Sequence, residues 1–188
     1  MKPAFVFPPE QTHDYETAGS GRHTNLRMWL RLLTCTMLIE TKIRMQLEGH
    51  FSVTLPQFDL MAQLDRVPEG LTMTALSERL MVSNGNVTGI VARLVADKLV
   101  EREIAKTDRR SFVVRLSRKG ALLFQDMAEK HEGWINEMFS ELSEDDVAAT
   151  MQLLAKTKQS VRSTGLEDPP RKASSSRGPR AKSARPTP

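Results

Sequence analysis

The stretch from Thr72 to Leu116 constrains the fold more than any other part of the chain, because its apolar pattern changes from helical to extended within it. Its first part has helical spacing from about Thr74 to Leu80 and again from about Asn84 to Asp97. Ser83 stands immediately before the second of these segments, where a hydroxyl can cap the first N–H groups of a helix. The pattern therefore predicts two helices joined by a short turn.

The two short segments that follow alternate with the period of two that is typical of β-strands. They run from Leu99 to Ile104 and from Ser111 to Leu116, and residues 105–110 join them as a loop. We therefore expect a two-stranded hairpin directly after the two helices. Helix, turn, helix and hairpin in this order predict a winged helix-turn-helix, which lays its second helix in the major groove of DNA.

Long helices are expected on both sides of this segment. From about Arg22, two neighbouring apolar stripes continue for about seven helical turns, and a helix that is apolar on two faces must be covered on two sides. The helical period returns after Ser117, and Ser143 with Asp146 forms a capping box for a last helix. The predicted fold class is mainly α with a small β-hairpin wing, and the doubly apolar helix favours a second subunit.

Changes in composition along the chain indicate how it is organised. Thr54 and Gln57 form another capping box, which predicts a helix from about Leu55 to Leu64. Both ends of the chain lack sustained periodicity, and the C-terminal end is rich in Ser, Pro, Arg and Lys. The predicted parts are a flexible arm at 1–21, a first dimerisation helix at 22–53, a winged helix-turn-helix DNA-binding domain at 54–118, C-terminal dimerisation helices at 119–164 and a disordered basic tail at 165–188.

The net charge of +4 is distributed unevenly. The tail at 165–188 has six cations and two anions, so the rest of the chain is neutral overall. Within that rest, residues 98–119 have eight cations and three anions, whereas residues 123–150 have one cation and eight anions. The basic pole coincides with the predicted hairpin, as expected of a surface that contacts nucleic acid.

The composition argues against several other classes of protein. The single cysteine, Cys35, excludes an internal disulfide framework, and the four histidines are too scattered for a zinc site. No export signal or membrane-spanning run is recognisable, so we expect a cytoplasmic protein with no membrane partner. The chain also lacks a glycine-rich phosphate loop and a nucleophile with an identifiable base, so neither an enzyme nor a cofactor is predicted.

The start of the second helix has the side chains that major-groove recognition needs. Such a helix requires short polar groups on the side toward DNA and apolar groups on the side that packs on the protein. Val87, Ile90 and Val91 fit the packed side, and Arg93 is suited to a phosphate contact. The residues of this segment predicted to contact DNA are Ser83, Asn84, Asn86, Thr88 and Arg93.

The loop of the hairpin is a second predicted contact. Lys106, Arg109 and Arg110 lie on it, and Asp108 can hold one of the arginines in position. Adjacent arginines on a narrow loop suit the minor groove of A·T-rich DNA, where the negative potential is deepest. A basic loop or a polar helix start by itself is usually only solvated, but the two together at this spacing favour DNA binding.

The segment from Leu55 to Gly120 resembles the MarR family of bacterial transcriptional regulators. The resemblance is carried by LPQFDLMAQL, TALSERL, VSNGNVTGIVARL and LVEREIAKTDRRSFVVRLSRKG, and with the flanking helices it extends over about 22–162. It implies a triangular, mostly helical homodimer that binds a palindromic operator in double-stranded DNA. It also implies that the protein represses nearby genes and leaves its operator when a small, often aromatic, ligand binds.

The chain departs from the family pattern at three positions. Met81 and Lys98 stand where the family usually has glycine, so two left-handed turns are expected to be reshaped or strained. Gly89 replaces a side chain that is often cationic in the family. The segment SNGNVTG is similar to the sequences of the family branch that controls the catabolism of aromatic compounds. This similarity implies an aromatic acid or an aromatic acyl-CoA thioester as ligand.

An anionic aromatic ligand needs an apolar slot with cations or hydrogen-bond donors at its edge. At the start of the first helix His23, Arg27 and Arg31 lie on successive turns, next to Met28. These four residues are the candidate effector site. The alternative, in which they are solvated or pair with acidic groups of a second subunit, remains open.

Two further functions are alternatives to a ligand-released regulator. A thiol-based redox sensor would use Cys35, but its neighbours Leu33, Met37 and Leu38 favour packing of this residue in a core. A DNA-packaging protein that binds without sequence preference would share the basic loop and tail. It would not need amide side chains at the start of the recognition helix, which favours a sequence-specific regulator.

Overall fold

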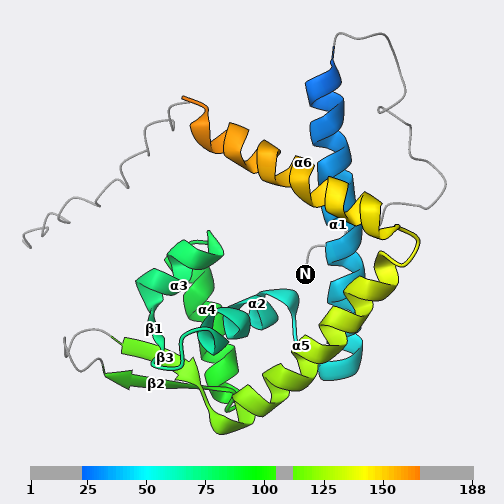
Figure 1. The fold of residues 1–188 in the computed structure, drawn as a ribbon. Helices are drawn as coiled ribbons and strands as arrows, with labels where there is room; N and C mark the ends of the chain where they lie inside the picture. The colour runs from blue at the N-terminus through cyan, green and yellow to red at the C-terminus, as the bar shows by residue number, and fades with distance from the viewer. Residues whose placement is uncertain (1–22, 105–111, 166–188) are drawn as a thin grey trace, which may run out of the picture. The chain divides into compact units, whose positions relative to one another are not determined.

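The computed structural model of the chain describes residues 23–104 and 112–165, so the predicted arm, the hairpin loop and all but the first residue of the predicted tail lie outside the described residues. The chain divides into two compact units between Glu141 and Leu142. The elements are α1 (Thr24–Phe51), α2 (Leu55–Asp65), β1 (Leu71–Thr72), α3 (Met73–Leu80), α4 (Asn84–Ala96), β2 (Val100–Ile104), β3 (Phe112–Leu116), α5 (Arg118–Met138) and α6 (Glu144–Ser163) (Figure 1). The predicted class, mainly α with a small β wing, is confirmed.

The predicted capping residues determine where several helices begin. The backbone N–H of Thr54 donates to Oε1 of Gln57 at 2.8 Å, which completes the capping box of α2. Ser83 caps α4, and Ser143 caps α6. Because an N-terminal hydroxyl or carboxylate satisfies N–H groups that have no partner within the helix, these helix starts could be predicted to within about one residue.

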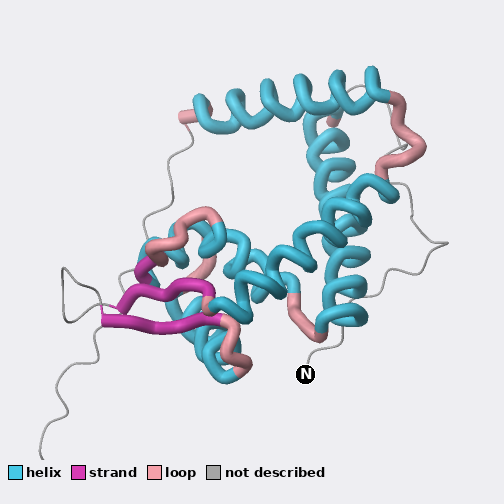
Figure 2. The backbone as a smooth tube through the Cα atoms, turned by 60° about the horizontal axis from the view of Figure 1, so that its bottom comes forward, coloured by secondary structure: helices cyan, strands magenta, loops and turns pink. Residues whose placement is uncertain are grey.

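The predicted hairpin is present as β2 and β3, but the sheet has a third strand, β1, that was not predicted. β3 lies between β2 and β1, and both neighbours are antiparallel to it. Leu71 and Thr72 of β1 pair with Val114 and Val113. A strand of two residues is too short to show alternation in the sequence. Figure 2 shows the strands together at the end of the first unit that is farthest from α1.

The core of the first unit lies where α2, α3 and α4 meet the sheet and the first half of α5. Its members come from every one of these elements, so the recognition helix is held on several sides. The most deeply buried side chains are Leu60, Met61, Leu64, Leu76, Val87, Val91, Leu94, Val114 and Met127, together with Leu47 of α1.

The C-terminal half of α1 and the helix α5 are joined by aromatic contacts. The ring of His50 stacks on that of Trp134 with 5.6 Å between the ring centroids, and Phe51 meets the same tryptophan edge-on. On the adjacent face, the ring of Phe58 in α2 lies 5.0 Å from that of His131 in α5. These contacts fix α5 against both α1 and α2 (Figures 1 and 2).

The contact between Phe58 and His131 leads to a prediction on pH. Burial lowers the pKa of His131 below its ordinary value of 6.5, because the charged form loses hydration. The unfolded chain therefore binds a proton at His131 more readily than the folded chain does. The stability that the neutral ring of His131 contributes is fully present above pH 6.5, and it is lost as the pH falls through the folded pKa. In His131→Phe, which keeps a ring against Phe58, we expect the melting temperature to fall less between neutral and mildly acidic pH than in the wild type. Equal falls in thermal unfolding experiments would contradict this assignment.

The second unit consists mainly of α6, which none of the described residues buries. Hydrogen bonds from the hydroxyl and the backbone N–H of Ser143 lower the pKa of Asp146, so the capping box is intact at neutral pH. Large apolar side chains nevertheless recur along the helix at Val147, Met151, Leu154 and Val161, and all four are exposed. None of the helices in residues 23–104 and 112–165 is both long enough and apolar enough to cross a membrane.

Candidate nucleic-acid interface

The turn between α3 and α4 is defined by hydrogen bonds at both of its ends. The hydroxyl of Thr72 accepts from the N–H of Ala75 at 3.2 Å and so caps α3. The N–H of Val82 donates to the carbonyl of Ser77 at 3.1 Å, which closes the end of that helix, and Ser83 then begins α4. Both helices of the motif are thus positioned by local hydrogen bonds as well as by the core.

One side of α4 is buried and the other is exposed. Val87, Val91 and Leu94 are almost completely buried in the core. By helical geometry Thr88 and Ala92 lie along one flank of the exposed side, and Asn86 and Arg93 along the other. All five α4-segment residues predicted to contact DNA are exposed, and they are Ser83, Asn84, Asn86, Thr88 and Arg93.

Gly85 and Gly89 occupy the middle of the exposed side of α4. A Cβ atom added at Gly89 would meet no atom within 4 Å, and one added at Gly85 would meet only the hydroxyl of Ser83, at 4.0 Å. Folding therefore does not require glycine at either position. Their effect is to leave the helix backbone bare between the two flanks.

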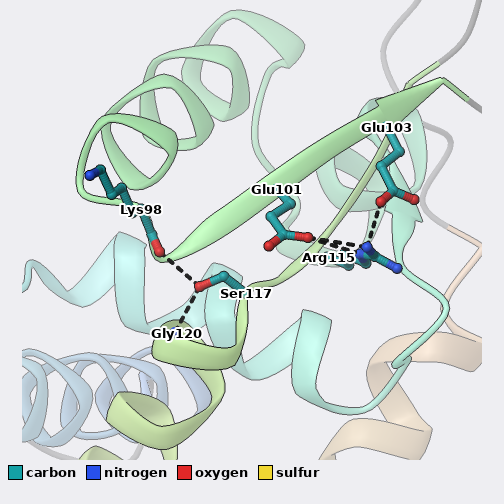
Figure 3. Close-up of polar contacts among 6 residues, drawn as sticks. All are labelled: Lys98, Glu101, Glu103, Arg115, Ser117 and Gly120. Carbon is teal, nitrogen blue, oxygen red and sulfur yellow. Dashed lines mark hydrogen bonds and ion pairs between the residues drawn. The ribbon is translucent and has the colours of Figure 1, made fainter.

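Two arginines of the wing have different neighbours, and Figure 3 shows Arg115 with its two carboxylates. Arg115 in β3 lies between Glu101 and Glu103 in β2 and forms an ion pair with each of them. Arg102 places its guanidinium carbon 4.6 Å from the ring centroid of Phe112. Because two carboxylates face Arg115, this residue adds little to the basic character of the wing. The predicted contacts Lys106, Arg109 and Arg110 lie outside the described residues.

A junction formed by Lys98, Ser117 and Gly120 connects the end of α4 to the start of α5 (Figure 3). The hydroxyl of Ser117 donates to the carbonyl of Lys98 at 2.7 Å and accepts from the N–H of Gly120 at 2.9 Å. The N–H of Ser117 donates to the carbonyl of Leu99 at 3.0 Å. The start of α5 is thereby hydrogen-bonded to the segment that joins α4 to β2.

The two positions at which glycine was expected keep left-handed backbones without it. The φ angles of Met81 and Lys98 are 54° and 59°. In an L-residue with a Cβ atom, this conformation costs roughly 1–2 kcal/mol. The turns are therefore not reshaped, and both residues are strained instead.

Replacing Met81 with glycine is expected to raise the free energy of unfolding by about 1 kcal/mol, because it removes the Cβ strain and the side chain is almost completely exposed. Chemical denaturation measures the change. Met81→Ala is the matched control, since it removes the exposed side chain but keeps Cβ, and we expect no gain from it. Equal effects of the two substitutions would show that left-handed strain is not the cause.

The predicted effector residues lie at the N-terminal end of α1, beside an open pocket of about 340 Å³. Arg27, Met28 and Arg31 line it, whereas His23 precedes the helix and is not among the described lining residues. The remaining described lining residues are Thr24, Leu32 and Cys35. The structure thus brings together three of the four residues that were predicted.

The prediction that Cys35 packs in a core is wrong within this chain. Its side chain is exposed, as are those of Leu33, Met37 and Leu38 around it. The apolar spacing of α1 indicated burial, but the described core covers only the C-terminal half of this helix, where Ile43 and Leu47 are buried. In residues 23–104 and 112–165, no three potential metal-ligating side chains lie together.

Sequence reasoning missed two features that position the interface. One is the pairing of β1 with β3, for which Gly70 was the available signal, since its φ angle of 91° is one that glycine adopts readily. The other is the junction at Ser117, whose signal was a serine followed by a glycine three residues later at the start of a helix. Both signals become specific only once the neighbouring strand is known.

Comparison with known proteins agrees with this architecture. The sequence model of the MarR family matches residues 51–111. The chain is 31% identical over 135 residues to the transcriptional activatory protein BadR of Rhodopseudomonas palustris, and the match covers 69% of this chain and 75% of that protein. The name of BadR describes a protein that acts in transcription, in agreement with the regulator expected from the sequence.

Solved structures show the same arrangement of elements. A MarR family transcriptional regulator from Silicibacter pomeroyi is 33% identical with a TM-score of 0.65, over 76% of this chain and 99% of that one. FabT of Streptococcus pneumoniae, solved in complex with DNA, is 21% identical with a TM-score of 0.63, over 73% of this chain and 97% of that one. The chain therefore belongs to the MarR family of DNA-binding transcriptional regulators, and it has the winged-helix fold of that family.

Proposed function

We propose that the protein is a dimeric regulator that recognises a specific palindromic operator through α4. The observation that carries this proposal is the division of α4 into a buried apolar side and an exposed side with short polar groups. Asparagine side chains such as those of Asn84 and Asn86 can pair with the major-groove edge of adenine. The similarly folded FabT was solved in complex with DNA, which supports the same use of the fold here.

The dimer is supported by apolar surface that the described residues leave uncovered. Stable monomers rarely expose large apolar patches, whereas subunit interfaces are built from them. A symmetric pair of subunits presents two recognition helices, which is why the operator should be palindromic. The exposed side chains proposed to lie in the interface are Leu26, Trp29, Leu33 and Met37 of α1 and Val147, Met151, Leu154 and Val161 of α6.

The wing provides the second contact of each subunit in this proposal. Lys106, Arg109 and Arg110 enter the minor groove next to the site of α4, and Arg93 contacts the backbone phosphates. Phosphate contacts position the protein, whereas the amides on α4 supply sequence preference. Replacing Asn84 or Asn86 with alanine should therefore change which sequences are bound, and replacing Arg93 should weaken binding to all of them.

A small anionic aromatic molecule is the proposed effector. The pocket beside α1 has the volume of a small-ligand site and places Arg27 and Arg31 next to Met28 and Leu32. Guanidinium groups at an apolar edge suit a carboxylate attached to an aromatic ring. Operator release by hydroxybenzoates should be impaired in Arg27→Ala and Arg31→Ala. Normal release in either variant would remove that arginine from the proposed site.

Repression is the proposed outcome of operator binding, with release by the effector. The similar protein BadR is named as an activatory protein, so activation is the second candidate. A reporter gene placed behind the bound promoter distinguishes them, since loss of the protein raises expression in the first case and lowers it in the second. The same reporter separates ligand release from thiol sensing, because a Cys35→Ser variant keeps its response to peroxide only if the cysteine is not the sensor.

Footprinting of the protein on the DNA upstream of its own gene tests the proposal as a whole. We expect two protected half-sites about one helical turn apart, or a multiple of it, and loss of protection when the effector is added. Hydroxybenzoates and their CoA thioesters are the probes. Uniform protection without half-sites would contradict the dimeric, sequence-specific mode of binding.

A further inference from the structure

The hydroxyl of Thr88 is already engaged within the recognition helix. It donates to the backbone carbonyl of Asn84 at 2.8 Å, although Thr88 is exposed on the side of α4 that is proposed to face DNA. A threonine hydroxyl has one proton. While this bond is kept, Thr88 can accept a hydrogen bond from DNA but cannot donate one.

The methyl group of Thr88 is then the main group that this side chain offers to a partner. Ala92, one turn further along the same flank, is also exposed and presents only a methyl group. Gly89, next to Thr88, has no side chain that could cover either of them, and no other atom lies within 4 Å of the place where its Cβ would be. From Thr88 to Ala92 this flank is therefore mainly apolar and offers no side-chain donor of its own. The nearest donor on the same flank is the amide of Asn84, one turn before Thr88, and the amide of Asn86 lies on the other flank.

The four bases differ in how they match such a surface. Guanine presents two acceptors in the major groove and would be left without a donor, whereas thymine presents a methyl group and its partner adenine presents an amino donor. We infer that Thr88 recognises thymine, with its methyl group against the C5-methyl group of the base. The inference rests on the proposed function of α4 and specifies one position in the base preference of each half-site.

Replacement of thymine by deoxyuridine tests this inference, since it removes the methyl group alone. Duplexes are first selected from a random-sequence library with the full-length protein, and each thymine of the selected duplex is then replaced in turn. Burial of one methyl-sized group corresponds to about a fourfold change in the dissociation constant. We expect a weakening of about this size at one thymine of each half-site.

Three variants assign the effect to the side chain. Thr88→Ser keeps the hydroxyl but lacks the methyl group, so its affinity should not depend on the thymine methyl, and Thr88→Val, which keeps a methyl group, should retain the wild-type dependence. Thr41→Ser is the matched control, because Thr41 is an exposed helical threonine on α1 whose hydroxyl donates in the same way to the carbonyl of Met37 at 2.7 Å. It should behave like the wild type.

Two outcomes would overturn the inference while leaving the proposed function intact. One is a selected duplex whose affinity for the protein stays the same whichever of its thymines is replaced by deoxyuridine. The other is a Thr88→Ser variant that keeps the wild-type sensitivity to the methyl group. A library from which no preferred duplex is selected would overturn the proposed function itself, and this inference with it.

Discussion

Replacing Gly120 with alanine is expected to lower the free energy of unfolding by at least about 3 kcal/mol. A Cβ atom at this position would lie 1.9 Å from the carbonyl oxygen of Leu99 and 2.8 Å from its carbonyl carbon. Backbone atoms cannot rotate away as a flexible side chain can, so α5 would have to move away from the start of β2. That movement breaks the hydrogen bonds of Ser117 to the carbonyl groups of Lys98 and Leu99.

Gly133→Ala is the matched control, since Gly133 lies in the same helix and an added Cβ would meet no atom within 4 Å. There the better helix propensity of alanine should raise stability by about 0.5–1 kcal/mol. Chemical denaturation of both variants measures the difference. Similar effects at the two positions would show that the junction at Ser117 does not hold α5 as closely as described.

Replacing Gly70 with alanine is the second large effect that we expect, a loss of about 3 kcal/mol. Its φ angle of 91° disfavours any residue with a Cβ atom. The added atom would also lie 2.6 Å from the carbonyl oxygen of Val114 and 2.5 Å from a methyl carbon of Val113. Since β1 follows directly, the substitution should separate β1 from β3 and loosen the start of α3.

The double variant Gly70→Ala with Val113→Ala separates the two causes. It removes the clash with the methyl group of Val113 but keeps both the backbone clash and the unfavourable φ angle. We therefore expect it to recover only a small part of the lost stability. Full recovery would mean that side-chain crowding alone explains the requirement for glycine. Gly49→Ala, in open space on α1, serves as the control for the glycine change itself.

The elements that the sequence predicted well are those determined by local rules. Helix starts at Leu55, Asn84 and Glu144 follow from caps that act within three residues, and the apolar side of α4 follows from helical spacing. The strand β2 was predicted with one residue too many at its N-terminal end, because backbone pairing, and not alternation, decides where a strand begins. Ser111, the predicted start of β3, lies outside the described residues.

What could not be predicted depends on contacts between distant residues. β1 exists only because Leu71 and Thr72 meet β3, about 40 residues later in the chain. The ion pairs of Arg115 with Glu101 and Glu103 follow from strand register, so the charge count for residues 98–119 could not show which of its cations face carboxylates. Cys35 was misplaced because apolar spacing indicates an apolar surface but does not show whether the same chain covers it.

The candidate site was likewise predictable only in part from the sequence. The α4 residues lie together because one helix carries them, and the structure adds that the hydroxyl of Thr88 is occupied by its own helix. The residues at the hairpin loop stay a prediction, since they lie outside the described residues. The assignment of Arg27 and Arg31 to an effector pocket likewise stays a proposal, supported by their common pocket on α1.

The most direct test of sequence-specific recognition by α4 is a competition experiment at about 0.15 M salt, where phosphate contacts alone bind DNA weakly. The full-length protein is bound to its footprinted operator and challenged with an excess of unrelated duplex DNA. We predict that the complex persists, and that an Asn84→Ala, Asn86→Ala double variant loses it while still binding DNA at low salt. Displacement of the wild-type protein by unrelated DNA as readily as by its own operator would contradict this account and would identify a DNA-packaging protein instead.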